Sequence, residues 1–241
     1  MKYILSAMLS VVFAIGAISA ASARLQLSIN VGASTFTCFD GQLGCDQNGG
    51  LNNLLVIDQT VDGAFIQVFL AQSQFGDPNT LQLSSSNIKN TTGSPITITL
   101  LGSDTNFIAP VEAVRNSASM TFNHAVGSGV STLKFWADAS NTQGANPNNT
   151  PGTLLETVSG TPITDPDSFS GSNTAAFTAL APFSMTEGAQ FSLIGGGSIT
   201  GLNLAMQTVI PEPSTWTMGL LGFGLLVIAA GRQRRKSNNF I

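Results

Sequence analysis

The sequence predicts an all-β body, an antiparallel β-sandwich with Greek-key or jelly-roll connections, flanked by an N-terminal signal helix and a C-terminal transmembrane helix. Three observations predict the β fold. Apolar residues of the body recur with a period of two rather than 3.6. Turn residues separate these segments at intervals of roughly eight to twelve residues. No stretch of the body has the apolar pattern of an amphipathic helix.

Residues 96–100 show the alternation most clearly, with Ile96, Ile98 and Leu100 separated by threonines. This pattern predicts a strand with one buried and one exposed face, which is typical of antiparallel sheets. The other segments that we interpret as strands are 25–29, 54–58, 64–70, 80–84, 120–124, 131–137, 153–158, 174–181, 189–194 and 202–206. Turns are predicted at 77–79, 92–95, 127–129 and 195–197, and a long exposed loop at 138–152.

Charge is scarce and unevenly placed. Charged residues are 9% of the chain, and the segment 24–210 carries four basic and twelve acidic residues, hence a net charge of −8. A nucleic-acid-binding surface needs clustered Lys and Arg, so this segment is not expected to bind nucleic acid. A surface rich in hydroxyls and amides is common in exported β-proteins, whereas cytosolic enzymes carry more charge.

The only cysteines, Cys38 and Cys45, lie seven positions apart. In an oxidising compartment this spacing favours a disulfide that closes a short loop, the alternative being two free thiols. Two cysteines without neighbouring histidines provide too few ligands for zinc, so no metal site is expected here.

The N-terminal segment 1–23 has the organisation of a secretory signal. Lys2 provides the positive charge, 4–18 is nearly all apolar, and Ala21 and Ala23 form a small-residue cleavage site. The apolar core is short for an uncleaved anchor. We therefore expect signal peptidase to cut before Arg24.

The C-terminal segment 216–231 carries no charge and begins with Trp216. As a helix it would be about 24 Å long, slightly shorter than the hydrocarbon core of a bilayer. The positive-inside rule keeps the basic cluster that follows it in the cytoplasm, so this cluster acts as a stop-transfer signal and the body lies on the periplasmic side. The cluster consists of Arg232, Arg234, Arg235 and Lys236.

A short motif precedes this helix and consists of Pro211, Glu212, Pro213, Ser214, Thr215 and Trp216. Together with the helix and the basic cluster, it resembles the PEP-CTERM sorting signal over residues 210–236. The resemblance implies a Gram-negative host and processing by exosortase, an integral enzyme of the inner membrane. It also implies transfer to the periplasm, outer surface or extracellular matrix, often in bacteria that make exopolysaccharide, a candidate partner. The predicted units are thus 1–23, 24–209, 210–236 and the tail 237–241.

A search for catalytic groups yields no constellation, and no catalytic residue or cofactor is predicted. His124 is the only histidine, and its register with Met120 and Phe122 favours a packed residue at a strand end. The chain has no G-x-S-x-G, H-E-x-x-H or P-loop motif. An acid pair for glycoside hydrolysis would have to come from scattered carboxylates such as Glu112, Glu156 and Glu187.

Two oxygen-rich segments, 40–48 and 165–168, could hold calcium, but neither has EF-hand spacing. Both are better interpreted as turns in which aspartate side chains accept hydrogen bonds from nearby backbone amides.

Three functions from different classes remain. The preferred one is a non-enzymatic protein of the cell surface or exopolysaccharide matrix. The second is a sugar- or surface-ligand-binding module, which would show a concave sheet face or loop end containing Trp136 with nearby acids. The third is a secreted hydrolase, which would need a solvent-open carboxylate cluster or an open His124 beside an acid.

Overall fold

The computed structural model describes residues 24–50, 52–76, 78–144 and 149–209. The predicted signal segment 1–23 and the segment 210–241, with the predicted span and basic cluster, lie outside these residues. Within the described ranges, no helix is long and apolar enough to span a membrane.

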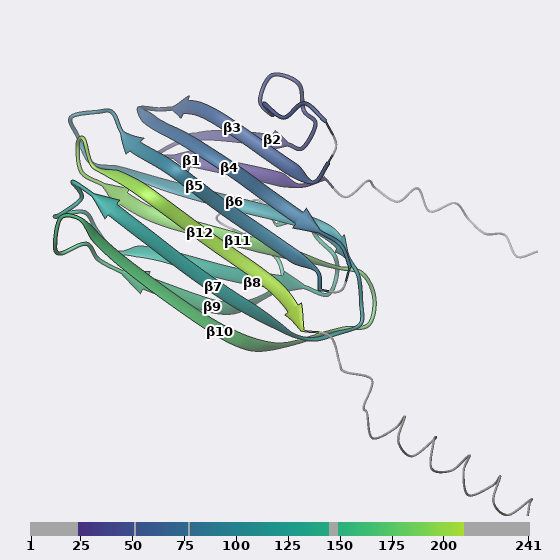
Figure 1. Cartoon of the computed structure of the whole chain (residues 1–241). Coiled ribbons are helices and arrows are strands. Elements are labelled where there is room, and N and C mark those ends of the chain that lie inside the picture. Colours follow the sequence, from purple (N-terminus) through teal and green to yellow (C-terminus); the bar gives the residue numbers. More distant parts are fainter. Residues whose placement is uncertain (1–23, 51, 77, 145–148, 210–241) are drawn as a thin grey trace, which may run out of the picture.

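Twelve strands form two six-stranded antiparallel sheets, which we name sheet A and sheet B (Figure 1). In spatial order, sheet A contains β2 (Ser34–Phe39), β1 (Gln26–Val31), β6 (Ile96–Phe107), β11 (Phe183–Leu193), β8 (Ser131–Asp138) and β9 (Thr153–Gly160). Sheet B contains β10 (Asp167–Ala179), β7 (Val111–Asn123), β12 (Ser198–Val209), β5 (Thr80–Asn90), β4 (Ala64–Gln74) and β3 (Leu54–Val61). The predicted all-β antiparallel architecture is confirmed.

The connections run mostly between the sheets. Four of them, β1–β2, β3–β4, β4–β5 and β8–β9, join neighbours in one sheet, while the other seven cross to the opposite sheet. Sequence neighbours are therefore often separated in space, and the centre of each sheet combines strands from distant parts of the chain. In sheet A, for example, β11 pairs with both β6 and β8.

The inner faces of the two sheets form one apolar core. Along β8, Leu133, Phe135 and Ala137 point inward and are buried, while Lys134 and Trp136 alternate with them and face outward. The rings of Phe177 in sheet B and Phe183 in sheet A lie 5.4 Å apart between centroids and connect the sheets. Burial of this apolar surface is the main force that holds the sheets together.

Most strands are longer than predicted, and one was missed. The strand predicted at 96–100 continues as β6 to Phe107. The prediction ended too early because Ser103 and Asp104 are polar, although both are buried in the structure. The strand predicted at 174–181 is β10, which ends at Ala179 and leaves Leu180 in an exposed turn. β2 is an edge strand with no clear buried face, so its residues lack the alternation that identifies the others.

The loop predicted at 138–152 as long and exposed is attached to the sandwich over its first half. Asn141 and Asn106 exchange two hydrogen bonds: Asn141 Oδ1 accepts from the backbone N–H of Asn106 at 2.7 Å, and Asn141 Nδ2 donates to Asn106 Oδ1 at 2.6 Å. The amide of Gln143 donates to the carbonyl of Arg24 at 2.6 Å. These bonds hold 138–144 against β6 and the start of the body.

Two buried asparagines tie the sheets together, one at each end of β5. Nδ2 of Asn79, just before β5, donates to the carbonyl of Ile108 at 2.7 Å, and the Asn79 backbone N–H donates to the hydroxyl of Thr208 at 2.9 Å. Nδ2 of Asn90, the last residue of β5, donates to the carbonyls of Leu193 at 3.0 Å and Ile194 at 2.9 Å. Both asparagines are fully buried.

Candidate functional site

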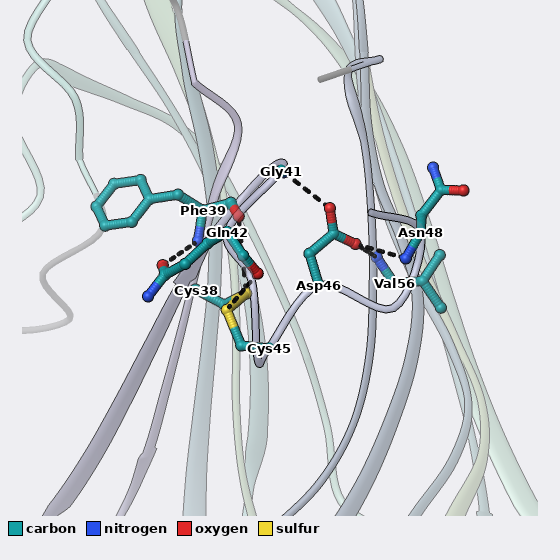
Figure 2. The surroundings of a disulfide bond; sticks show 8 residues. All are labelled: Cys38, Phe39, Gly41, Gln42, Cys45, Asp46, Asn48 and Val56. Atoms are coloured by element: carbon teal, nitrogen blue, oxygen red, sulfur yellow. Dashed lines mark hydrogen bonds between the residues drawn. A yellow bond between two sulfur atoms is a disulfide. The ribbon is translucent and has the colours of Figure 1, made fainter. Parts of the chain in front are cut away.

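A disulfide between Cys38 and Cys45, whose Cα atoms are 5.9 Å apart, closes the loop after β2 (Figure 2). The adjacent carboxylate of Asp46 accepts hydrogen bonds from the backbone N–H groups of Gly41 at 2.8 Å and Asn48 at 3.0 Å. Asp40 accepts from two backbone N–H groups further along the same loop. These acids thus act as acceptors that shape the loop, which agrees with the turn interpretation of this segment.

Removing the disulfide should lower the free energy of unfolding by about 2.5 kcal/mol, because the cross-link restricts an eight-residue loop in the unfolded chain. The test is urea denaturation of the Cys38→Ala/Cys45→Ala variant beside the wild type. A reducing agent should destabilise the wild type by a similar amount and leave the double variant unchanged. Equal stability of the two oxidised proteins would contradict this expectation.

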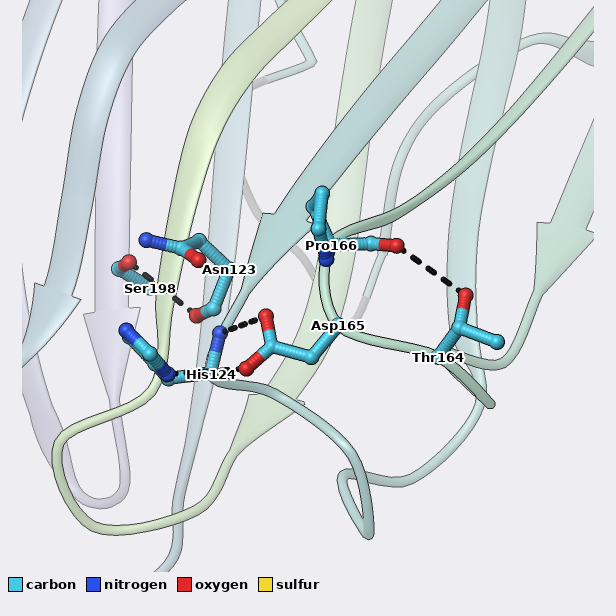
Figure 3. A network of polar contacts seen from close by, with 6 residues as sticks. All are labelled: Asn123, His124, Thr164, Asp165, Pro166 and Ser198. Carbon is cyan, nitrogen blue, oxygen red and sulfur yellow. Dashed lines mark hydrogen bonds and ion pairs between the residues drawn. The ribbon is translucent and has the colours of Figure 1, made fainter.

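His124 is exposed, so the expectation that it packs against the core was wrong. Strand β7 ends at Asn123, and His124 adopts a positive φ of 52°, which turns its side chain away from the core. Its Nδ1 atom lies 2.9 Å from Oδ2 of Asp165, and its backbone N–H donates to Oδ1 of the same residue at 2.7 Å (Figure 3). The side chain of His124 is 74% exposed.

An open histidine beside an acid is the feature that the hydrolase hypothesis required, but the pair lacks a third partner in the described part of the chain. The two hydroxyls drawn in Figure 3 bond elsewhere: Ser198 donates to the carbonyl of Asn123 at 3.3 Å, and Thr164 to that of Pro166 at 3.1 Å. Nucleophilic catalysis needs a hydroxyl or thiol in reach of the base. The contacts between His124 and Asp165 link the end of β7 to the loop before β10.

Two other carboxyl groups are buried inside the sandwich. Glu187 on β11 is fully buried, and loss of hydration raises its pKa well above the usual range. The amides of Leu83 and Met206 oppose this effect, but neither carboxyl oxygen makes a hydrogen bond of normal geometry. Asp104 bonds to the hydroxyl of Ser73, and burial raises its pKa to about 6.

Neither buried group is open to solvent, so neither can form the exposed carboxylate cluster that hydrolysis would need. Glu156 on β9 is half-buried, and burial raises its pKa as well. Among the residues that the structure describes, no three His, Cys, Asp or Glu side chains are grouped so that they could hold a metal ion.

The outer face of sheet A presents a different kind of site. Trp136, half-buried, lines a hollow that also contains Leu101, Lys134 and Gln190. These residues come from β6, β8 and β11, which are neighbours in the sheet although they are distant in the sequence. Trp136 was singled out from the sequence as the marker of a binding face, but the predicted nearby acids do not line the hollow.

The chain matches the family model of the PEP-CTERM protein-sorting motif over residues 209–236. The match includes every residue predicted to form the motif and the basic cluster. No curated protein matches the sequence.

Solved structures with a similar arrangement of strands are distant. They include the active domain of tailspike protein 4 of bacteriophage CBA120, with 8% identity and a TM-score of 0.31. That alignment covers 70% of this chain and 21% of the tailspike chain. The CBM22-1 xylan-binding domain of Paenibacillus barcinonensis Xyn10C has 13% identity and a TM-score of 0.27, with 65% of this chain and 87% of that chain covered.

A third similar structure is the C-terminal CBM6 of LamC from Zobellia galactanivorans, with 14% identity and a TM-score of 0.24. Its alignment covers 52% of this chain and 98% of that chain. These likenesses are too distant to support conclusions about function. The sorting motif is specific, and it begins at Val209, the last residue of β12. The chain is therefore a PEP-CTERM sorting domain-containing protein.

Proposed function

We propose that this protein is exported and held at the inner membrane by its C-terminal span, and that exosortase then releases it as a non-enzymatic protein of the cell surface or exopolysaccharide matrix. The observation that carries this proposal is the position of the Pro-Glu-Pro triplet, which begins at Pro211, two residues after the end of β12 at Val209. The strands that the structure describes all end before this triplet, so processing at or beyond it would remove no part of the sandwich.

The attachment point of the tail supports the same proposal. Strand β12 pairs with β7 on one side and β5 on the other, so it lies inside sheet B rather than at its edge. Near its end, Thr208 accepts a hydrogen bond from the backbone N–H of Asn79, and its own N–H donates to the Asn79 carbonyl at 3.0 Å. The last strand is thus held by contacts within the sandwich.

The way the body uses its carboxylates supports a non-enzymatic role. Asp46 accepts hydrogen bonds from the backbone of its own loop, Asp165 from His124, and Asp167 from Ile163 at 2.7 Å. These backbone bonds lower the pKa of Asp167. Carboxylates used in this manner stabilise turns, whereas catalytic acids keep their oxygens free for a substrate.

Processing by exosortase can be tested with the full chain in an exosortase-positive host and in its deletion strain. We expect a product without the C-terminal segment outside the inner membrane in the first host, and a membrane-bound product that keeps this segment in the second. Intact mass and cell fractionation measure both outcomes.

A Pro211→Ala/Glu212→Ala/Pro213→Ala variant should keep the C-terminal segment in both hosts, since it lacks the motif. The matched control is Asn238→Ala/Asn239→Ala in the tail beyond the basic cluster, which should be processed like the wild type. If the C-terminal segment stays attached in both hosts, the proposed processing is wrong and the tail is a plain anchor.

A further inference from the structure

The outer face of sheet A carries two adjoining hollows, which together we name the sheet A groove. The two hollows share Thr99 and Gln190. One hollow continues to Trp136 and Lys134 on β8, and the other to Asn30 on β1. From β2 to β8 the groove crosses four strand spacings, or roughly 19 Å at about 4.8 Å each. This length suits an extended chain better than a single small molecule.

Trp136 gives one end of the groove an aromatic surface, and the backbone below it is adapted to this ring. A Cβ atom at position 188 would lie 3.0 Å from Cζ3 and 3.3 Å from Cη2 of Trp136, and 2.8 Å from Cδ2 of Leu101. A side chain at 188 would therefore have to displace the tips of Leu101 and Trp136. The indole remains half-exposed there, and an aromatic face of this kind can pack against the C–H face of a sugar ring.

The rest of the groove is polar but largely uncharged. Thr97, Thr99 and Gln190 line it, and their hydroxyl and amide groups can exchange hydrogen bonds with sugar hydroxyls. A site that combines an aromatic platform with a few placed polar groups is typical of small-molecule and carbohydrate binding.

The charge of the groove points to the kind of sugar. The segment 24–210 has a net charge of −8, yet no acidic side chain lines the groove. Lys134 is its one charged residue, and within the described ranges no carboxylate forms an ion pair with it. An unpaired ammonium group beside Trp136 would attract an anionic group on the ligand.

We propose that the sheet A groove binds a saccharide chain that carries carboxylate groups, with one sugar ring packed on Trp136 and a carboxylate bound by Lys134. This binding site goes beyond the proposed sorting function and does not depend on processing by exosortase.

The test uses the full chain in mild detergent with Trp216→Phe, which leaves Trp136 as the only tryptophan. Titration with oligogalacturonate should change the Trp136 fluorescence saturably, and added salt should weaken the binding. Dextran of similar length is the neutral probe and should bind at least about threefold more weakly, because it offers Lys134 no charge.

Variants are compared by affinity electrophoresis in gels that contain polygalacturonate. Trp136→Ala should weaken binding at least about tenfold, as expected for a central aromatic contact. Lys134→Gln should weaken it about three- to tenfold and reduce its salt dependence. The matched control is Lys89→Gln, which removes an exposed lysine from sheet B and should bind like the wild type.

Thermal unfolding of each variant shows whether lost binding reflects lost folding. Gly188→Val retains the indole of Trp136 but crowds it, so this variant should also bind more weakly than the wild type. Wild-type affinity of folded Trp136→Ala, or no binding of either polymer, would overturn the site. Equal affinity for dextran and oligogalacturonate, unchanged by Lys134→Gln, would overturn the acidic ligand. Because the unprocessed chain is tested, each of these failures is distinct from a failure of the sorting experiment.

Discussion

Replacing Asn90 with aspartate is expected to lower the free energy of unfolding by about 3–5 kcal/mol at neutral pH. Nδ2 of Asn90 donates to three carbonyls: those of Ser94 at 2.7 Å, Leu193 at 3.0 Å and Ile194 at 2.9 Å. A carboxylate cannot donate, so it would face these carbonyls with repulsion and leave them without a partner. The loss is large because Asn90 is fully buried and joins β5 in sheet B to β11 in sheet A.

Urea unfolding at several pH values measures this effect. The destabilisation should shrink in acid, where the aspartate binds a proton and regains a donor. Asn173→Asp introduces the same charge at an exposed position of β10 and should change stability by no more than about 0.5 kcal/mol. A comparable loss in both variants would mean that added charge, rather than the tie between the sheets, is responsible.

The role of Asn90 also shows what the sequence could not predict. The alternation in 96–100 and 202–206 is local, so it predicts strands that bury one face. Asn90 and Leu193 are 103 positions apart, and nothing near Asn90 in the sequence indicates the carbonyls that it meets. In the same way, Asp104 is buried because Ser73 lies beside it on the other sheet, a contact between residues 31 positions apart.

The same distinction applies to the candidate sites. The sorting motif is a contiguous segment, and its residues, span and basic cluster can be identified without knowledge of the fold. The sheet A groove is assembled from β1, β2, β6, β8 and β11, and only its tryptophan could be noticed beforehand. The prediction for His124 failed for a local reason, since the strand ended one residue earlier than the alternation suggested and the positive φ reversed the side chain.

The stability of the body is expected to fall as the pH rises from 4.5 to 7.5. Burial raises the pKa values of Glu187 and Asp40, and it raises that of Asp104 from 3.8 to about 6. Below the unfolded-state values these carboxyls are protonated in both states. Between the unfolded and folded values, only the unfolded chain releases the proton, so folding stability is lost progressively. For Asp104 alone the loss between pH 4.5 and 7.5 is about 2 kcal/mol.

Two other aspartates act in the opposite direction but at lower pH. Hydrogen bonds from backbone amides lower the pKa values of Asp138 and Asp167, so their contribution is lost as the pH falls below about 4. The unfolding free energy should therefore pass through a maximum in mild acid. Urea denaturation at intervals from pH 3 to pH 8 measures this profile.

Glu187→Gln isolates the contribution of one buried carboxyl to this profile. The amide keeps the size of the side chain and cannot ionise, so the variant should be more stable than the wild type by about 1–3 kcal/mol at pH 7.5. At pH 4 the two proteins should be nearly equal, because Glu187 is then neutral in the folded state. Glu112→Gln, at an exposed position on β7, should follow the wild-type profile. Two outcomes would contradict this prediction: a wild-type stability that rises from pH 4.5 to 7.5, or a Glu187→Gln variant that is less stable than the wild type at pH 7.5. Either would mean that the ionised Glu187 carboxylate does not destabilise the folded protein.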